Sequence, residues 1–177
     1  VRAPVAARGA DPLTTLTVEA VDWATWAPTV RATLLFVVCG GQVLLIRKKR
    51  GLGAGKINGP GGKLDPGETP LECALRETFE EVGVRATGAR EAGQLYFEFV
   101  DGLRIHCTVF RADGCEGQVV ETAEAVPLWT PVDQLPYAQM WADDRHWLPA
   151  LLAREPFTLW GTFDGEQMLD YRLQIGG

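Results

Sequence analysis

Soft metal ligands are scarce in this sequence. Its 177 residues include only two histidines, and the four cysteines are dispersed without a C-x-x-C pair. A structural zinc site needs four such ligands at close spacing, so the sequence argues against one. We expect the thiols to be buried or inert in a reducing compartment. The cysteines are Cys39, Cys73, Cys107 and Cys115.

The sequence also lacks an excess of positive charge and any long apolar run. Lys and Arg number 17 against 23 Asp and Glu, which gives a formal net charge of −6. Long nucleic acids require a basic surface, so we expect no such partner. A small anionic ligand needs only a local positive site or a bound cation. No apolar run approaches the ~20 residues of a membrane span, and we expect a cytoplasmic monomer that does not bind a membrane.

Apolar residues are numerous enough for one core. They make up 46% of the sequence, which argues against disorder and suits a single domain. We interpret residues 1–28 as an extension that packs onto a domain spanning residues 29–177. The start is rich in Ala, Arg and Pro and lacks the apolar core of a secretion signal. It is also short and broken by Pro4 and Pro12, which argues against a transit peptide. The pattern assigns no chemistry to this extension.

Turn signals divide the domain into strands. Gly-Gly at 40–41, Asp-Gly at 101–102 and Asp-Gly at 164–165 each separate two β-rich stretches, which predicts three hairpins. Residues 126–132 predict a further short strand. The stretch 50–62 holds six glycines and predicts a structured loop with neither helix nor strand. With two main helices in addition, the pattern predicts an α+β fold or an α/β/α sandwich with a mixed sheet.

The first predicted helix begins directly after the glycine-rich loop. Thr69 fits the N-cap position, Pro70 the first helical position and Glu72 the third, which together form a capping box. Gly83 fits the helix end. Four residues at helical spacing should face the sheet, namely Leu71, Leu75, Thr78 and Val82. A second helix is predicted within residues 140–155, with Asp143 or Asp144 near its start.

Three glutamates gather on the first helix, and like charges at this spacing repel one another. They are Glu77, Glu80 and Glu81, on the side opposite the predicted leucine face. A solvated acidic surface is the ordinary interpretation of such a cluster. Two features favour a metal site instead. The acids lie near the helix C-terminus, where the macrodipole disfavours them, and they follow a glycine loop that can approach a ligand. Hard oxygen ligands of this kind suit Mg²⁺ or Mn²⁺.

The same stretch resembles the signature of the Nudix hydrolase family, G-x5-E-x7-R-E-U-x-E-E-x-G-U, where U is a bulky apolar residue. The one departure is Thr78 at the first U position, a mild change because Thr is isosteric with Val. The resemblance implies an α/β/α sandwich that hydrolyses nucleoside diphosphates linked to another group, with a divalent metal. The matching residues are Gly62, Glu68, Arg76, Glu77, Glu80, Glu81, Gly83 and Val84.

The resemblance also implies roles for these residues. Glu77, Glu80 and Glu81 would bind metal or activate water, and which of them is the base stays open. Arg76 would orient a glutamate, and Glu68 would brace the loop onto the helix. Beyond the signature, the resemblance offers the Gly61 carbonyl and Glu121 as further metal ligands. Gly62 and Gly83 would have structural roles.

The flanking sequence, from about residue 29 to about residue 173, is similar to the MutT class of this family. Mammalian-type members of that class cleave 8-oxo-dGTP and related oxidised purine triphosphates to the monophosphate and pyrophosphate. The resemblance implies that Asn58 contacts the base edge and that Trp141, Asp143 and Asp144 recognise the base. An aromatic plane stacks on a purine, and a buried carboxyl pair readily keeps one proton. Further residues implied near the nucleoside are Thr33, Lys48, Phe97 and Phe99.

Other interpretations of these residues stay open. Trp141 could be plain core, the two aspartates could cap a helix, the two phenylalanines could be sheet packing, and Asn58 could hold a left-handed turn.

The loop also departs from the mammalian-type sequence, with Leu52 and Ile57 at positions that are aromatic there. The preferred base could therefore differ. Two rival functions are a Nudix hydrolase acting on another nucleoside diphosphate derivative and a non-catalytic nucleotide-binding module. The second usually loses glutamates that this sequence keeps.

Overall fold

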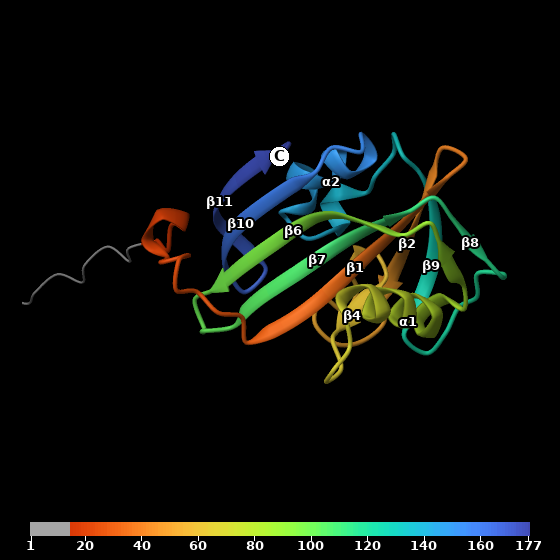
Figure 1. The fold of residues 1–177 in the computed structure, drawn as a ribbon, viewed down its shortest axis with the longest axis horizontal. Helices are drawn as coiled ribbons and strands as arrows, with labels where there is room; N and C mark the ends of the chain where they lie inside the picture. Colours follow the sequence, from red (N-terminus) through yellow and green to blue (C-terminus); the bar gives the residue numbers. More distant parts are fainter. Residues whose placement is uncertain (1–14) are drawn as a thin grey trace, which may run out of the picture.

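The structure, a computed structural model, describes residues 15–177, so expectations for residues 1–14 lie outside it. Nine strands form one mixed sheet in the order β11-β10-β6-β7-β1-β2-β3, with β4 paired to β1 and β9 paired to β2 (Figure 1). The elements are η1 (Val18–Ala20), β1 (Val30–Cys39), β2 (Gln42–Lys48), β3 (Ile57–Asn58), β4 (Gly61–Lys63), α1 (Pro70–Val82), β5 (Arg85–Thr87), β6 (Arg90–Phe99), β7 (Arg104–Ala112), β8 (Gly114–Glu116), β9 (Ala125–Pro131), η2 (Tyr137–Gln139), α2 (Asp144–Leu152), β10 (Phe157–Asp164) and β11 (Gln167–Ile175).

All three predicted hairpins are confirmed. Strands β1 and β2 pair next to the Gly-Gly turn, while β6–β7 and β10–β11 pair along most of their lengths. Two parallel pairings, β1 with β7 and β6 with β10, make the sheet mixed. The short strand predicted at 126–132 is β9, which pairs antiparallel with β2. Strands β5 and β8 form a separate two-stranded sheet.

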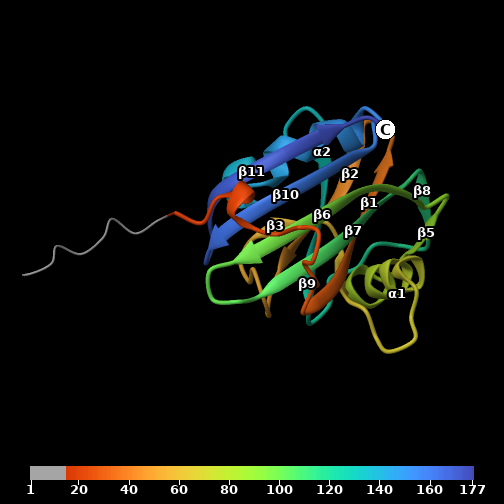
Figure 2. The same cartoon turned by 60° about the vertical axis from the view of Figure 1, so that its left-hand side comes forward.

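Helices α1 and α2 cover opposite faces of the sheet, as the expected α/β/α sandwich requires (Figures 1 and 2). Side chains alternate across a strand, and β1 follows this rule. Phe36 packs on the α2 side, where its ring lies 5.7 Å from that of Trp147. Leu35 and Val37 pack on the α1 side with Ala74. The two faces of one strand thus join two apolar cores.

Helix α1 has the predicted ends and a different buried face. The Thr69 hydroxyl accepts a hydrogen bond from the Glu72 N–H, the Glu72 carboxylate accepts one from the Thr69 N–H, and Gly83 ends the helix with φ 79°. The prediction that Leu71 faces the sheet is wrong, because this side chain is 39% exposed. The buried positions are Cys73, Ala74, Thr78, Glu81 and Val82. The acids therefore do not all point away from the sheet.

The glycine-rich loop also differs from expectation, because it contains the short strands β3 and β4. Strand β4 pairs with β1, placing Gly61 beside Leu34. A Cβ at Gly61 would lie 1.9 Å from the Thr33 carbonyl oxygen, so only glycine permits this approach. The pairing of β4 with β1 places the glycine-rich loop beside α1. Within residues 15–177, no helix is both long and apolar enough to cross a membrane.

The four cysteines all fall in the described part of the chain, where none forms a disulfide. Cys73 and Cys107 are buried, as expected, and burial raises the pKa of both thiols. Cys39 at the end of β1 is exposed, so burial does not extend to every thiol.

Candidate active site

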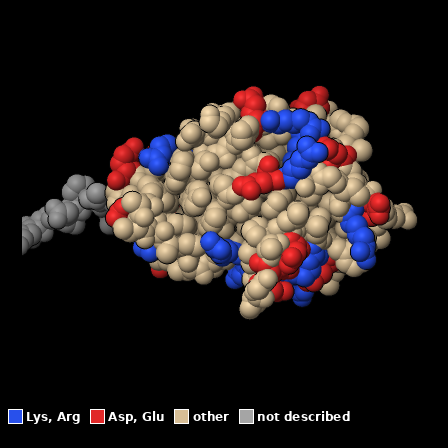
Figure 3. Space-filling view, viewed as in Figure 1, with Lys and Arg blue, Asp and Glu red and all other residues tan. Residues whose placement is uncertain are grey.

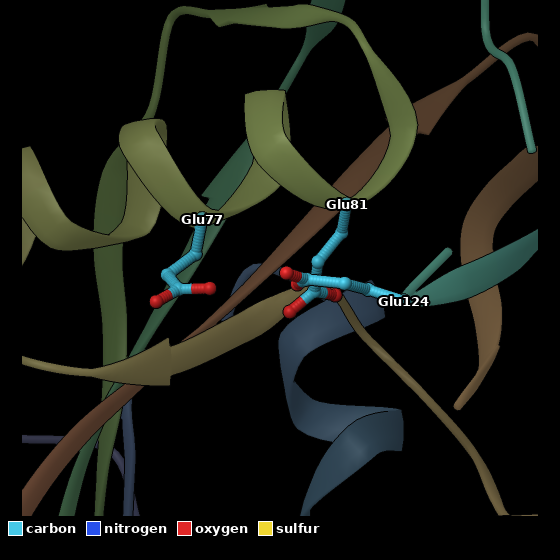
Figure 4. Close-up of side chains that lie close together, drawn as sticks. All are labelled: Glu77, Glu81 and Glu124. Carbon is cyan, nitrogen blue, oxygen red and sulfur yellow. The ribbon is translucent and has the colours of Figure 1, made fainter. Parts of the chain in front are cut away.

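Three carboxylates converge at the edge of α1. Glu77 and Glu81 lie one helical turn apart, and Glu124 comes from the loop just before β9. Figure 4 shows all three side chains pointing toward a common point. Each offers an oxygen, and these oxygens lie within 4.8 Å of one another. We call this set the acidic group. Residues four apart share a helix face, so the sequence spacing anticipated Glu77 with Glu81, whereas Glu124 was missed.

Burial makes the acidic group unfavourable without a cation. Glu81 is only 3% exposed, and its Oε2 atom has no hydrogen-bond partner among residues 15–177. Burial, reinforced by the Glu77 charge, raises the pKa of Glu81 to about 8. Burial also raises the pKa of Glu77. An orphaned buried oxygen among clustered carboxylates is the donor set that a hard divalent cation requires. The residues present therefore fit a divalent metal ion.

The glycine loop closes against this group. A Cβ at Gly62 would lie 2.4 Å from the Glu77 carboxyl carbon, so a side chain there would displace the carboxylate. Gly61 lies on the same stretch of β4, and its backbone opposes the rise in the pKa of Glu81. The loop therefore approaches the two glutamates with backbone alone. Glycine is required at Gly62 by the Glu77 carboxylate and at Gly61 by the Thr33 carbonyl.

Arg76 ties the loop to the helix. Its Nε donates to Glu68 Oε1 at 2.6 Å, and its Nη1 atom donates to Glu77 Oε1 at 3.0 Å. The Glu68 carboxylate also accepts from the Asp65 N–H. These bonds, the Arg76 contact first, lower the pKa of Glu68 to about 2. Glu68 thus braces the loop through Arg76, which also holds the Glu77 carboxylate.

Two predicted metal ligands lie outside the acidic group. Glu121 pairs with Lys49 at 2.6 Å, and its side chain is 59% exposed. Glu80 pairs with Arg76 at 3.1 Å and is 47% exposed. Glu124, three residues after Glu121, is the loop glutamate that lies within the acidic group. The two glutamates lie in one loop, and the backbone of Glu124 is tied to the end of β2 by the hydrogen bond from the Lys49 N–H to its carbonyl at 2.9 Å.

A pocket of about 330 Å³ opens beside the acidic group, on the α2 side of the sheet. It is bounded by Gly61 and Gly62 at one end and by Trp141 and the two aspartates of α2 at the other. A larger cavity of about 410 Å³ lies on the opposite face, beside the start of α1, and its lining includes none of the acidic group. The three carboxylates do not line the smaller pocket either, but Gly61 and Gly62 do, and Gly62 lies against the Glu77 carboxylate. The smaller pocket is therefore the one connected to the acidic group. All the predicted nucleoside residues line it: Thr33, Lys48, Asn58, Phe97, Phe99, Trp141, Asp143 and Asp144.

Asp143 and Asp144 are both buried and do not act as caps. Asp143 occupies the N-cap position without a side-chain cap bond within the described chain, and its Oδ2 accepts from Trp147 Nε1 at 2.8 Å. Asp144 Oδ2 has no hydrogen-bond partner among residues 15–177. Burial raises the pKa of Asp143 to about 6, while burial and the Asp143 charge raise the pKa of Asp144 well above its usual range. The helix-capping alternative is therefore wrong.

Trp141 is held by strand β10 and by the glycine-rich loop. Its ring lies edge-on to Phe163 of β10 at 6.1 Å, and the Lys56 ammonium lies 5.4 Å from the ring centroid. Lys56 also pairs with Glu166 in the β10–β11 turn at 3.3 Å. A Cβ at Gly53 would meet the indole nitrogen at 2.9 Å. Lys56 and Phe163 were missed in the sequence, because neither lies in a motif and both reach the site through tertiary contacts.

The other predicted pocket residues already make contacts within the protein. The Thr33 hydroxyl donates to Cys73 Sγ at 3.3 Å, and Lys48 Nζ donates to the Leu52 carbonyl at 3.1 Å. Asn58 Oδ1 accepts from the Gly59 N–H. Phe97 and Phe99 both pack against Phe163 at 5.3 Å. Of the two departures from the mammalian-type loop, Leu52 lines the pocket, whereas Ile57 is buried in the core.

Comparison with known proteins agrees with this geometry. The family model of the NUDIX domain matches residues 28–151. The chain is 42% identical over 140 residues to the oxidized purine nucleoside triphosphate hydrolase of Danio rerio, covering 77% of this chain and 88% of that protein. The Mus musculus protein of the same name is 40% identical over 146 residues, covering 80% and 92%.

A solved structure is similar as well. The mutator MutT protein from Bacillus halodurans matches with a TM-score of 0.74 and 28% sequence identity, covering 82% of this chain and 97% of that chain. The chain belongs to the Nudix family.

Proposed function

We propose that this protein is a metal-dependent pyrophosphohydrolase for oxidised purine nucleoside triphosphates, with 8-oxo-dGTP as the favoured substrate and nucleotide-pool sanitation as the role. One observation carries the proposal. One pocket is lined both by Gly61 and Gly62, which lie beside the acidic group, and by the buried Asp143–Asp144 pair, which suits a ligand with a phosphate end and a base end. The names and 40–42% identities of the relatives from Mus musculus and Danio rerio support the same substrate class.

At the phosphate end, Glu77, Glu81 and Glu124 would hold Mg²⁺, or Mn²⁺ in its place. The predicted ligands Glu80, Glu121 and the Gly61 carbonyl are secondary candidates. A bound divalent cation neutralises phosphate oxygens and acidifies water. The protein's own part is to fix these carboxylates, since Arg76 holds Glu77, Gly62 lies against the Glu77 carboxylate and the Gly61 backbone favours the charged form of Glu81. One of the glutamates then accepts the proton of the attacking water.

At the base end, the two aspartates provide an acceptor and a donor. Asp143 receives the Trp147 N–H, which favours its ionised form. Asp144 lies beside that charge with an unpartnered oxygen among the described residues, so it keeps its proton. The pair thus presents a hydroxyl and a carbonyl to the edge of a purine, with Asn58 as a further polar group. Trp141 provides the stacking surface.

Two further properties belong to the proposal. We expect a monomer, because one chain supplies both ends of the pocket. We expect a cytoplasmic location, where free thiols persist. On the face that Figure 3 shows, Lys and Arg are interspersed with Asp and Glu instead of forming a continuous basic surface, which supports a small nucleotide over long nucleic acid.

Pyrophosphate release from 8-oxo-dGTP and dGTP, each with Mg²⁺ and with EDTA, tests the function. We expect a higher kcat/KM for the oxidised nucleotide and loss of turnover with EDTA. Metal-dependent release without a preference would keep the acidic group as the catalyst and contradict the base-recognition assignment. A nucleotide-sugar and a dinucleoside polyphosphate in the same panel would then identify a different nucleoside diphosphate substrate. Absence of turnover on every nucleotide would contradict the enzyme assignment itself.

A further inference from the structure

The chain that precedes β1 lies across the sheet on the face opposite to the pocket. Figure 2 shows this segment, coloured red to orange, passing over β10 and β6 before it enters β1. Residues 16–26 include the short helix η1, whose Val18 is 1% exposed. We call residues 16–26 the N-terminal clasp. They precede the stretch matched by the NUDIX domain, which begins at residue 28.

Three hydrogen bonds fasten the clasp to three neighbouring strands. Thr162 of β10 donates its hydroxyl to the Leu16 carbonyl at 2.7 Å. The Val18 N–H donates to Asp170 of β11 at 2.8 Å. Trp26 Nε1 donates to Glu98 Oε2 of β6 at 2.7 Å. Two of these bonds have an ionisable carboxylate as acceptor, and such bonds are stronger than neutral ones. The Trp26 ring also lies edge-on to Tyr96 of β6 at 5.8 Å.

The strand residues that hold the clasp are direct neighbours of the pocket wall. Glu98 lies between Phe97 and Phe99, and Thr162 precedes Phe163. Side chains alternate across a strand, so the clasp bonds lie on one face and the three phenylalanines on the other. Glu98 and Thr162 are also register partners in the parallel β6–β10 pair. Both clasp contacts therefore act on one short stretch of the wall.

The β-sheet is irregular at this stretch of the wall. The β10–β11 ladder changes register between Thr162 and Phe163, which interrupts regular pairing. The Phe163 ring contacts Phe97, Phe99 and Trp141. A small shift of β10 at this irregularity would move Phe163 and, through it, the tryptophan that we assign to base stacking.

From this geometry we propose that the N-terminal clasp positions the base-binding wall and thereby contributes to base selectivity. This inference rests on the proposed function, because it assigns the clasp to the base end of the pocket. The clasp acts from behind the sheet and contacts neither end of the pocket, so Trp26 is a positioning residue. Its loss should weaken binding of the base while leaving the acidic group intact.

The test substitutes Trp26→Phe, which keeps an aromatic ring and removes the indole N–H that reaches Glu98. Binding of 8-oxo-dGMP and dGMP without metal is measured by calorimetry. We expect the Kd for 8-oxo-dGMP to rise about fivefold, less than the full value of a hydrogen bond to a carboxylate because the clasp acts through the wall, and the preference over dGMP to shrink. The kcat of pyrophosphate release at saturating substrate should stay within about twofold of wild type.

Two further variants make the result specific. Trp23→Phe is the matched control, because Trp23 Nε1 donates to the Val18 carbonyl within the clasp and not to the sheet. It should bind both monophosphates like wild type. Thr162→Val removes the hydroxyl that reaches Leu16 with little change in volume, and it should reproduce the Trp26→Phe effect. Equal Kd values for wild type, Trp26→Phe and Thr162→Val would overturn the inference.

Hydrogen exchange separates this inference from the proposed function. In Trp26→Phe, amides of residues 97–99 and 161–163 should exchange faster than in wild type, with α1 unchanged. If wild type shows no preference for the oxidised base, the proposed substrate is wrong, and exchange still decides whether the clasp holds the wall. Unchanged exchange in residues 97–99 and 161–163 would overturn the clasp whatever the substrate is.

Discussion

At the scale of single residues, burial separates the acids that still need a partner from those that already have one. Glu81 and Asp144 are almost fully buried, and each has an oxygen without a partner among the described residues. Glu80 and Glu121 are half exposed and paired with cations. A buried unpaired carboxylate destabilises the fold unless a ligand compensates, whereas an exposed ion pair is nearly neutral. We therefore expect the buried carboxylates Glu81 and Asp144 to have functional roles.

Glu124 and Glu121 provide a matched pair for testing this distinction. We expect Glu124→Gln to lower kcat/KM by roughly 100-fold and to weaken Mg²⁺ binding, because it removes a charge from the acidic group. Glu121→Gln changes only an exposed ion pair with Lys49. It should leave kcat/KM and the affinity for Mg²⁺ within about twofold of wild type. Steady-state kinetics and Mg²⁺ titration measure the two effects. The reverse order of effects would place Glu121 at the metal.

The aspartate pair predicts a pH dependence of stability. In the unfolded chain an aspartate loses its proton above the ordinary pKa of 3.8. In the folded state the pKa values of both aspartates are raised, so the pair keeps protons at higher pH. The free energy of unfolding therefore falls as pH rises from about 4 through about 6, where Asp143 titrates. Asp144→Asn needs no proton uptake on folding, so its melting temperature should exceed that of wild type at pH 8 and not at pH 4. It should also lose preference for the oxidised base. Equal melting temperatures at pH 8 would contradict the raised pKa values.

At the scale of elements, α1 combines two tasks that compete. Its buried side must pack against β1, and the same side must carry Glu81 into a partly polar site. The small residues Cys73 and Ala74 allow close packing on the buried side. The Thr78 hydroxyl donates a hydrogen bond to the Ala74 carbonyl at 2.7 Å. The exposed Leu71 is the consequence, because the buried face is set by the sheet edge and the acids together. The buried face predicted from sequence periodicity was therefore rotated around the helix axis by about one residue from the observed one.

The end of α1 provides an element-level prediction. Gly83 has φ 79°, and an added Cβ would meet Val120 at 2.8 Å. Gly83→Ala should lower the free energy of unfolding by about 2 kcal/mol through left-handed strain and this clash. Gly41→Ala is the control, since Gly41 has φ 75° and open space, and should cost about 1 kcal/mol from strain alone. Denaturant unfolding measures both. Equal losses would show that Val120 moves aside without penalty.

At the scale of the whole molecule, one sheet joins the two halves of the site. Glu124 lies directly before β9, which pairs with β2, while β6 and β10 form the wall at the base end. The two ends of the pocket thus come from segments more than 80 residues apart in sequence, as Glu77 and Phe163 illustrate. Metal binding at one end should stabilise the fold as a unit, because the site exists only when the sheet is complete.

Thermal unfolding tests this coupling. Mg²⁺ at 100 times its Kd should stabilise the wild type by about 2.7 kcal/mol, seen as a higher melting temperature that EDTA reverses. Glu81→Gln should start with a higher melting temperature in EDTA, because it removes a buried charge, and gain little from Mg²⁺. The same gain in both proteins would show that the cation binds elsewhere.

The sequence by itself determined what depends on local spacing. The capping box at Thr69, the left-handed Gly83, the three hairpins and the i, i+4 pair Glu77–Glu81 all follow from patterns within a few residues. The family resemblance followed from the same stretch, and the NUDIX match agrees with it. Local geometry is fixed by backbone dihedral preferences and hydrogen bonds between near neighbours, which are legible in a sequence.

Only the tertiary structure decided what depends on pairing between distant segments. The tertiary structure brings Glu124 from the loop before β9 to Glu77 and Glu81, and the packing of α1 buries Glu81 and leaves Leu71 in solvent. The contacts of Lys56 and Phe163 with Trp141, and of Trp26 with Glu98, also join segments that no local pattern connects. A shift of one residue in strand register reverses which side chains face a site, so local sequence cannot specify them.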